Sequence, residues 1–471
     1  MDLFRKKEIG KLLKKNTSLD RNLTVLDLSL LGIGAIIGTG IFVLTGVAGE
    51  IAGPSLVFSF LLAGFVCFFS ALSYAEFSSI LPVAGSVYAY SYITMGEFIA
   101  WMIGWDLMLQ YLFSASTVSV GWSGYFQSLL SGFNIHLPSY FTAAPFAKKD
   151  VITYFNLPAF LMVIFITFLL SRGTSKSKHV NNFFVFFKLF VILLFIVVGI
   201  FYVKPSNFKP FVPFGLNGIF YAAAIVFFAF IGFDTVAAAA EETKNPKRDL
   251  PRGILFSLLF CTILYILVSI ITMGIVPLDI LKQNVDHPIS LVISLIGQNW
   301  IAFFIDLGAI LGMISVMFAM IYGQTRIAMA MCRDGLLPNS LAKIDSKYQT
   351  PYRLTWLVGL IAAMIGAFVP LDKLAELVNI GTLFAFSFVS LAVIILRKTH
   401  PDLPRAFRCP FVPFVPLLSI FSCIFLMLQL KLLTWVAFLV WLLLGVIFYF
   451  SYSFKHSKLN KDKSDMKVLE T

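Results

Sequence analysis

The chain has 471 residues, 59% of them hydrophobic and 13% charged, whereas a soluble domain carries about 25% charged residues. A soluble core could not bury that much apolar surface, so a soluble enzyme, a disulfide-rich secreted scaffold and a disordered chain are excluded. The net charge of +12 would indicate nucleic-acid binding in a soluble protein, but in a membrane protein it more often marks loops on the cytoplasmic side. The composition therefore indicates a polytopic membrane protein.

Twelve apolar runs are long enough to cross a membrane, since a spanning helix needs about 20 residues. The fold class that we predict is an all-α integral membrane protein with 12 transmembrane helices. The predicted spans are 26–48, 54–80, 97–126, 152–171, 183–203, 217–240, 253–276, 300–331, 354–370, 375–396, 413–431 and 434–454.

The basic residues orient these spans. With the N-terminus inside, the cytoplasmic segments carry 27 Lys and Arg and the external segments carry seven, which fits the positive-inside rule. Both termini are therefore predicted to be cytoplasmic, and the basic charge is spread over loops rather than gathered into a nucleic-acid-binding face. The predicted divisions are a basic arm (1–25), a repeat of helices 1–5 (26–203), a repeat of helices 6–10 (217–396), helices 11 and 12 (397–454) and a basic tail (455–471).

Two of the predicted spans are interrupted. The first contains four glycines within nine residues, from Gly32 to Gly40, and the sixth contains Gly232 close to Asp234. Each glycine costs about 1 kcal/mol relative to alanine in a helix, so the cluster needs a reason. Close packing of helices through small residues is one reading. Broken helices at matching positions of two halves are the other, and they indicate a transporter site within a five-plus-five inverted repeat.

An unwound segment at membrane depth exposes backbone groups that a ligand can bind. If the first span breaks between Ile36 and Gly38, the N–H groups of Thr39 and Gly40 face the gap at the positive end of the outer half-helix, where they suit a carboxylate. Carbonyl groups released around Ile36 and around 228–231 suit an ammonium. Donors and acceptors around one gap match an α-amino acid better than a sugar or an inorganic ion.

Several motifs carry a resemblance to a known family: the glycine motif at 32–42, Gly232-Phe233-Asp234 with the charged loop at 239–251, and the segments 323–326 and 333–338. From about residue 20 to 455 the chain resembles amino acid permeases of the amino acid–polyamine–organocation (APC) superfamily, and within it the bacterial cationic amino acid transporter-like branch. The resemblance implies the five-plus-five fold and secondary transport of amino acids.

Lys188 lies inside the fifth predicted span. Snorkelling to the nearby cytoplasmic surface would explain it, because six residues of helix cover only about 9 Å. In the family that the chain resembles, a lysine at this place points to the carbonyl groups of the broken first helix, where sodium-coupled relatives hold an ion. Because burial disfavours the charged form of a lysine, we expect Lys188 to carry the coupled proton.

Gln110 stands where related permeases commonly have a glutamate near the substrate, so the resemblance favours neutral over cationic amino acids. Asp234 follows the glycine of the sixth span, and we expect its carboxylate to cap the inner half-helix. The predicted substrate-binding residues are Ile36, Ile37, Gly38, Thr39, Gly40, Gln110, Phe228, Ala229, Phe230 and Ile231. The predicted structural or gating residues are Gly34, Gly232 and Asp234.

Other charged and aromatic residues are expected near the membrane surface. Glu76, Asp106 and Asp306 lie toward predicted span ends, where water can reach them. The segment 82–95 has three tyrosines and no Lys or Arg, and we expect an amphipathic helix that lies on the inner face of the membrane.

These features together predict a secondary active transporter in the plasma membrane, a bacterial inner membrane being compatible with the composition. We expect proton-coupled uptake of L-amino acids by alternating access, with neutral substrates favoured over cationic ones. An exchanger of amino acids or polyamines would carry the same motifs, and a membrane amino acid sensor is the alternative from a different class.

Chemistry of other kinds is not expected. The sequence holds no H-E-x-x-H, G-x-S-x-G or P-loop motif, so we predict no enzyme. The five cysteines are scattered, and the five histidines lie in or beside polar connections, so we predict no metal site and no cofactor besides a proton as coupling ion. The expected partners are an amino acid substrate and membrane lipids, with no nucleic acid, and a monomer is compatible with the sequence.

Overall fold

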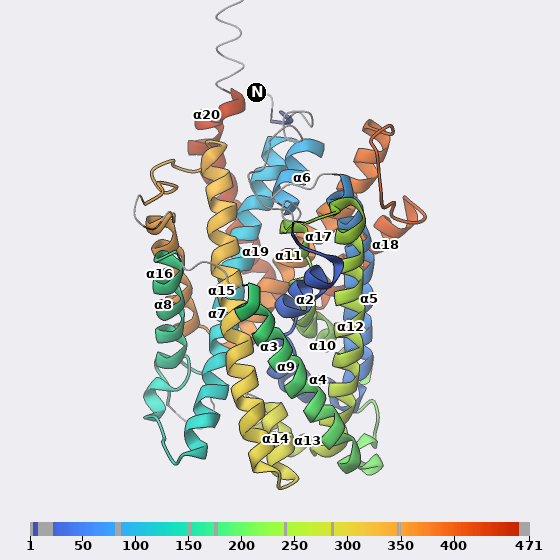
Figure 1. The fold of residues 1–471 in the computed structure, drawn as a ribbon, viewed down its shortest axis with the longest axis vertical. Coiled ribbons are helices and arrows are strands. Elements are labelled where there is room, and N and C mark those ends of the chain that lie inside the picture. The colour runs from blue at the N-terminus through green and yellow to red at the C-terminus, as the bar shows by residue number, and fades with distance from the viewer. Residues whose placement is uncertain are drawn as a thin grey trace, which may run out of the picture.

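The computed structural model describes residues 3–7, 22–80, 86–147, 152–173, 178–239, 243–283, 287–345, 348 and 350–460. Within these residues the secondary structure is helical, apart from one isolated bridge between Leu23 and Thr243. Figure 1 shows that most helices run along the long axis of the molecule, with α13 and α14 at one end and α6 and α20 at the other. The predicted all-α class is confirmed.

The helices follow the predicted apolar runs closely. In the first half they are α2 (Val25–Ile36), α3 (Thr39–Phe42), α4 (Leu44–Ala52), α5 (Leu56–Ile80), α6 (Ser86–Thr94), α7 (Glu97–Gly132), α8 (Leu157–Ser171) and α9 (Lys178–Gly199). In the second half they are α10 (Gly215–Val226), α11 (Thr235–Ala238), α12 (Pro246–Ile275), α13 (Leu278–Gln283), α14 (Pro288–Leu295), α15 (Asn299–Arg333), α16 (Tyr352–Phe368), α17 (Leu371–Thr399), α18 (Phe414–Gln429), α19 (Leu432–Phe448) and α20 (Phe454–His456).

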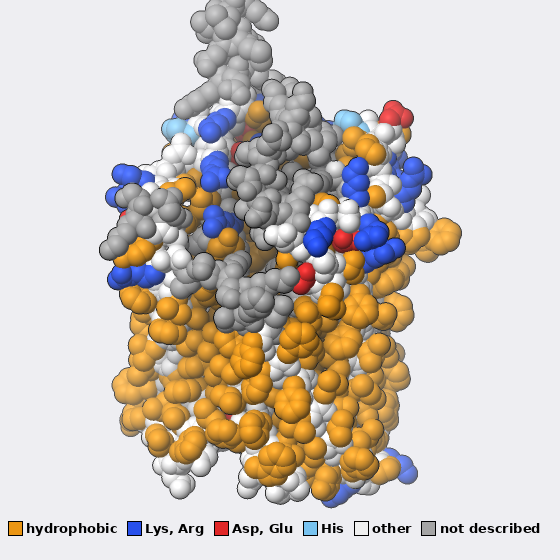
Figure 2. Space-filling model, viewed as in Figure 1, with side chains coloured by type: hydrophobic (Ala, Val, Ile, Leu, Met, Phe, Trp, Pro, Cys, Tyr) orange, Lys and Arg blue, Asp and Glu red, His pale blue; other side chains and the backbone are white. Residues whose placement is uncertain are grey.

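Length and hydropathy mark the molecule as a multi-pass membrane protein. Among the described residues, eight helical stretches are long and apolar enough to cross a membrane, and α2, α8, α16 and α18 are shorter apolar helices. Figure 2 shows a broad hydrophobic band across the visible face of the molecule, with Lys and Arg gathered mainly at the upper end of the view. Because these four helices are shorter than a full membrane span, the count of twelve spans stays a prediction.

The helices form two packed groups. In one group, α12 packs extensively against α5 and α2, and α10 packs against α4 and α5. In the other, α7 packs against α15 and α17, while α8 packs against α16. The broken helices belong to the first group, and they meet the second group where α3 touches α7 and α15. The first broken helix therefore lies at a contact between the two groups.

Three acidic side chains lie deeper than predicted. Glu76, Asp106 and Asp306 are 1%, 0% and 5% exposed, so the expectation that water reaches them is wrong. Glu76 forms ion pairs with Arg397 at 2.7 Å and Arg405 at 3.3 Å, which offset the cost of burying its charge. The position of Glu76 in its predicted span did not reveal these ion pairs, because the two arginines come from α17 and from the loop after it.

The segment 82–95 does contain a helix, α6, but the helix does not lie exposed on a membrane surface. Residues 82–85 fall outside the described part of the chain. Tyr88, Tyr90 and Tyr92 are all at most 2% exposed, and α6 packs against α7 and α17. The Tyr88 hydroxyl donates a hydrogen bond to Asp334 at 2.6 Å. The prediction of an interfacial helix is therefore wrong, and α6 is part of the protein interior.

Candidate functional site

The first predicted span is broken as the glycine cluster suggested. Helix α2 begins with a capping box, in which the side chains of Thr24 and Asp27 each accept a hydrogen bond from the backbone N–H of the other residue. The helix ends at Ile36. Ile37 is extended, Gly38 is also not helical, with φ of −159° and ψ of −141°, and α3 begins at Thr39. The first N–H groups of α3 have no acceptor within their own helix, so they are available to a ligand.

The sixth predicted span is broken too. Helix α10 ends at Val226 and passes into a 3₁₀ turn over Phe227–Phe230. Ile231 is extended, and Gly232 has a φ of +129°, a value that residues other than glycine rarely adopt. The short helix α11 then begins at Thr235. The glycine is therefore required by the backbone conformation at the break.

The two breaks pack directly against each other through glycines. A Cβ atom on Gly40 would overlap the backbone of Ala229 in the second break. In the same way, a Cβ atom on Gly232 would lie 2.7 Å from the carbonyl carbon of Ala35 in the first break. Each break thus contributes one glycine that lets the other backbone approach, which explains the glycines at both places.

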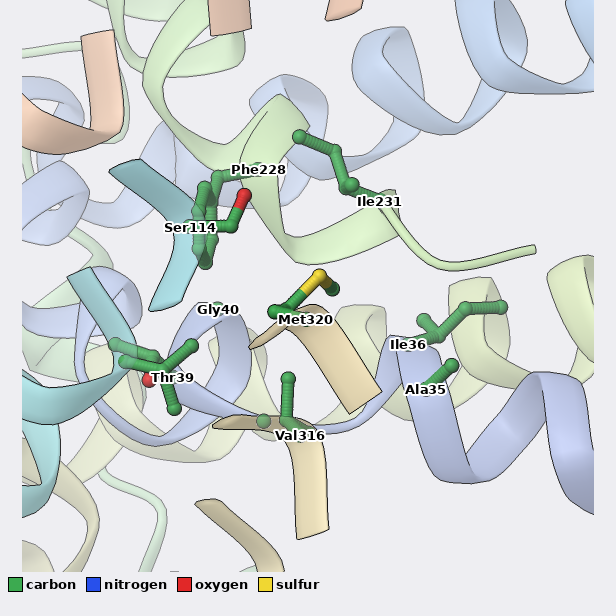
Figure 3. Close-up of a pocket in the computed structure, with 11 residues that line it drawn as sticks. Ala35, Ile36, Thr39, Gly40, Ser114, Phe228, Ile231, Val316 and Met320 are labelled. Carbon is green, nitrogen blue, oxygen red and sulfur yellow. The ribbon is translucent and has the colours of Figure 1, made fainter. Parts of the chain in front are cut away.

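A small cavity lies between the breaks and the second helix group. Its volume is about 10 Å³, room for about one water molecule. Figure 3 shows its lining residues converging from separate elements. The lining consists of Ala35, Ile36, Gly38, Thr39 and Gly40 from the first break, Phe228 and Ile231 from the second, Ser114 and Val118 from α7, and Val316 and Met320 from α15.

The cavity combines two polar hydroxyls with apolar walls. The Thr39 and Ser114 hydroxyls are buried and have no hydrogen-bond partner among the described residues. Val118, Val316 and Met320 supply aliphatic surface, and no charged side chain from the described part of the chain lines the cavity. Within the same residues, no group of three or more His, Cys, Asp or Glu side chains could hold a metal ion. The cavity therefore suits a small ligand with one polar end and one apolar end.

Six of the ten predicted substrate-binding residues line this cavity: Ile36, Gly38, Thr39, Gly40, Phe228 and Ile231. The other four do not. The Ala229 backbone packs on Gly40, and Phe230 packs edge-on against Phe60 and Tyr265. Gln110 lies one helical turn before Ser114 on α7, is 3% exposed, and leaves its side-chain oxygen without a partner among the described residues.

Lys188 is fully buried and reaches the first break from α9. Its Nζ atom donates hydrogen bonds to the Gly34 carbonyl at 2.5 Å and to the Ile37 carbonyl at 2.8 Å. Snorkelling to the surface is therefore excluded as the explanation of this lysine. The predicted substrate ligand Ile37 turns its carbonyl to Lys188, and the predicted structural residue Gly34 packs against Val185 of the same helix α9.

Tyr265 of α12 joins the two breaks. Its hydroxyl lies 3.1 Å from the Ile36 carbonyl and 2.8 Å from the Ala229 carbonyl, one oxygen from each break. Tyr265 and Lys188 therefore bind carbonyl groups of the breaks. From the sequence alone, these carbonyl groups were expected to be free for a ligand. A hydroxyl so far along the chain from either break gives no signal in the sequence.

Asp234 corrects another expectation. It occupies the first position before α11, but its side chain makes no capping hydrogen bond. Instead, the Thr235 hydroxyl donates to the Gly232 carbonyl at 2.6 Å, which satisfies one of the backbone groups freed by the break. The predicted capping role of the Asp234 carboxylate is therefore wrong.

Five lining residues were not predicted: Ala35, Ser114, Val118, Val316 and Met320. Helical periodicity could have found Ser114, because it lies four residues after Gln110 and so shares a face of α7 with it. Val316 and Met320 share a face of α15 in the same way, but apolar residues in an apolar helix carry no distinguishing signal.

Comparisons with known proteins agree with this geometry. A family model described as "Amino acid permease" matches residues 23–452. The chain is 59% identical to a branched-chain amino acid permease, BcaP, of Bacillus subtilis (strain 168), and 51% identical to a methylthioribose transporter of the same strain; each match covers 98% of this chain and 99% of the relative. It is 30% identical to human cationic amino acid transporter 4, over 94% of this chain and 89% of that protein.

Proposed function

The chain belongs to the amino acid permease family, a family of transporters rather than enzymes, and from this premise we propose that it imports neutral branched-chain amino acids together with protons. The observation that carries the proposal is the cavity between the two breaks, which has two free hydroxyls, aliphatic walls and, among the described residues, no charged side chain in its lining. The high identity to a branched-chain amino acid permease supports the same substrate class.

The carboxylate of the substrate binds at the start of α3. Backbone N–H groups at the beginning of a helix are donors, and the positive end of the helix dipole favours an anion there. The Thr39 hydroxyl lies at the same place and is buried without a partner among the described residues. Ser114 offers a second hydroxyl from α7.

The ammonium of the substrate binds the carbonyl edge of the breaks. A carbonyl oxygen has two lone pairs, so the Ile36 carbonyl, which takes one hydrogen bond from Tyr265, keeps acceptor capacity for an ammonium. Ile36, Phe228 and Ile231 all line the cavity. The substrate side chain then packs on Val118, Val316 and Met320, and aliphatic side chains match these surfaces better than a charged one.

The size of the cavity requires movement during transport. About 10 Å³ does not hold an amino acid, so the broken helices must separate from α7 and α15 when substrate enters. The two packed groups of helices provide the surfaces for this movement, in agreement with alternating access. The proposal includes the predicted twelve spans, the five-plus-five inverted repeat and the cytoplasmic position of both termini.

Lys188 carries the coupled proton in this proposal. As an ammonium it can donate to the Gly34 and Ile37 carbonyls at the same time, and this holds α9 to the break. A neutral amine keeps two N–H donors, but its hydrogen bonds lack the charge assistance of an ammonium, so loss of the proton weakens the link and favours a different position of α2. The movements of substrate and proton across the membrane are then joined through one broken helix.

Uptake into proteoliposomes of the purified protein tests the proposal. Labelled leucine, isoleucine, valine, alanine and arginine are supplied outside, with and without an acidic exterior. We expect the three branched-chain substrates to accumulate only with the gradient, and unlabelled arginine to leave leucine uptake unchanged. Unlabelled methylthioribose is included as a competitor because one relative is a methylthioribose transporter.

Two results would contradict the proposal. Preferred uptake of arginine or of methylthioribose would show that the substrate class is wrong. Efflux that is stimulated by external amino acid, with no response to the pH gradient, would show an exchanger in place of a proton symporter.

A further inference from the structure

A larger cavity lies away from the substrate cavity, where α8 ends and α16 begins. Its volume is about 270 Å³. Arg172, Asp345 and four aromatic side chains line it, namely Phe168, Tyr348, Tyr352 and Trp356. It shares no lining residue with the substrate cavity, and nothing in amino acid transport requires it.

This second cavity lies at the edge of the apolar part of the molecule. Helix α8 is an apolar helix that ends at Ser171, and Arg172 follows directly. Helix α16 is apolar as well and begins at Tyr352 beside α8, as Figure 1 shows. Phe168 and Tyr352 are each 42% exposed. Trp and Tyr side chains favour the depth of the lipid headgroups, so the cavity opens at headgroup level.

One side of the cavity suits a phosphate. The Arg172 guanidinium donates one hydrogen bond to the Tyr348 hydroxyl at 2.5 Å and lies 5.0 Å from the centre of the Phe168 ring. An arginine has five N–H donors in a planar fork that fits a phosphate. The Trp356 indole N–H is buried with no partner among the described residues, which is costly unless a ligand accepts from it.

The other side suits a cation. The Asp345 carboxylate lines the cavity and accepts a hydrogen bond from the Tyr348 N–H at 3.0 Å. The face of the Tyr352 ring attracts an ammonium as well, whereas the Tyr348 ring already lies against Arg172. The wall is fixed, since Asp345 N–H donates to the Thr350 carbonyl at 2.8 Å and the Thr350 hydroxyl donates to the Ser171 carbonyl at 2.9 Å.

We propose that this cavity binds the headgroup of a phosphatidylethanolamine molecule from the adjacent leaflet. The phosphate binds Arg172 and the Trp356 N–H, and the ammonium lies toward Asp345 and the Tyr352 ring. A headgroup with one charge of each sign matches a cavity with one arginine and one aspartate. An anionic headgroup brings no ammonium to the Asp345 carboxylate, and a choline cannot donate hydrogen bonds to it.

Native mass spectrometry of the full chain in detergent tests the proposal. The protein is titrated with phosphatidylethanolamine, phosphatidylglycerol and phosphatidylcholine of identical acyl chains, and with free phosphoethanolamine. We expect one molecule of phosphatidylethanolamine to bind about tenfold more tightly than the other two lipids, because charge-assisted hydrogen bonds are the strong ones. Free phosphoethanolamine is expected not to compete.

Variants separate the two ends of the headgroup. Arg172→Ala and Trp356→Phe should each weaken phosphatidylethanolamine binding, the second while keeping an aromatic ring in place. Asp345→Asn should move the preference from phosphatidylethanolamine to phosphatidylglycerol. Arg353→Ala is the matched control, because Arg353 is an exposed neighbour that does not line the cavity. Thermal unfolding of each variant checks that it is folded.

Three outcomes would overturn the proposal. Equal binding of all three lipids would show no headgroup recognition. Equal losses for Arg172→Ala and Arg353→Ala would show a general attraction of basic residues to lipid. Displacement of the lipid by free phosphoethanolamine would show a site for a soluble ligand. None of these results bears on amino acid transport, so the two proposals stand or fall separately.

Discussion

The two sides of the first break carry different chemistry, although only a few residues separate them. On one side, Thr39 and Gly40 begin α3 beside an uncharged cavity. On the other, the buried Lys188 ammonium donates to the carbonyls of Gly34 and Ile37. The donors of the break are left for a ligand, whereas two of its carbonyl groups are bound by the protein itself.

This difference shows that an unwound helix does not leave all its backbone groups to a substrate. Tyr265 removes further acceptor capacity by bridging the Ile36 and Ala229 carbonyls. The backbone groups that stay free fit one small zwitterion on the cavity side of the break. The protonatable Lys188 side chain occupies the opposite side. A break used in this way can bind substrate on one face and respond to protons on the opposite face.

We expect the largest effect from a change that pushes the two breaks apart, because it disturbs both the substrate side and the Lys188 side of the first break. Gly40→Ala places a methyl group against the Ala229 backbone. Overpacking costs about 1–3 kcal/mol, so we expect leucine uptake to fall about 5- to 150-fold. Gly132→Ala is the matched control, because nothing lies within 4 Å of a Cβ atom there. Normal uptake by Gly40→Ala in proteoliposomes would show that the close contact is not needed.

A change at Lys188 should affect only the proton side. With one proton per leucine, a difference of one pH unit supports about tenfold accumulation. Lys188→Met should abolish this accumulation, and Lys188→Gln should do so while keeping a donor for the carbonyl groups. Lys247→Met, at an exposed position, is the control. Full gradient-driven uptake by Lys188→Met would contradict the proposed role.

A negative charge at position 110 should change which substrates the protein binds. Gln110 is buried one turn from Ser114, and a carboxylate there would offer a counter-charge to a basic substrate. Hydrogen bonds to charged groups contribute about 1.5–3 kcal/mol, so we expect Gln110→Glu to gain about tenfold in affinity for arginine. Competition with labelled leucine measures it, with Gln429→Glu at the end of α18 as control. No gain would show that position 110 does not sense the substrate.

The smallest effect concerns one hydroxyl of the cavity. Ser114→Ala removes a hydrogen bond to substrate worth about 0.5–1.5 kcal/mol, so the KM for leucine should rise about 2- to 10-fold. The ratio of uptake with and without a pH gradient should stay unchanged. Ser131→Ala, on an exposed part of α7, is the control. An unchanged KM would place the substrate away from Ser114.

The sequence predicted the breaks well because glycines inside apolar helices are unusual and expensive. It did not reveal that Lys188 binds the Ile37 carbonyl or that Tyr265 binds the Ile36 carbonyl, because these partners come from α9 and α12 and meet the break only in the folded chain. Hydropathy located the helices because apolar residues fill the spans. For the same reason it could not single out Val316 and Met320 as cavity residues among the other apolar residues of α15.

Burial of charge was the poorest prediction. Asp106 is fully buried with both oxygens unpartnered among the described residues, although it was expected near water. Its depth follows from α7 being 36 residues long and packed against α15 and α17, which a hydropathy window does not reveal. Tertiary contacts, in place of the distance from a predicted span end, decide which acids meet water.

The separation of the two faces is tested most directly by measuring leucine binding and gradient-driven uptake on the same variants. Equilibrium binding to the purified protein gives the affinity, and proteoliposomes give the accumulation ratio. We expect Ser114→Ala to weaken binding with an unchanged accumulation ratio, and Lys188→Gln to abolish accumulation with leucine binding within about twofold of the unmodified protein, a difference below about 0.5 kcal/mol. Equal loss of leucine binding in both variants would contradict the division of the break into a substrate face and a proton face.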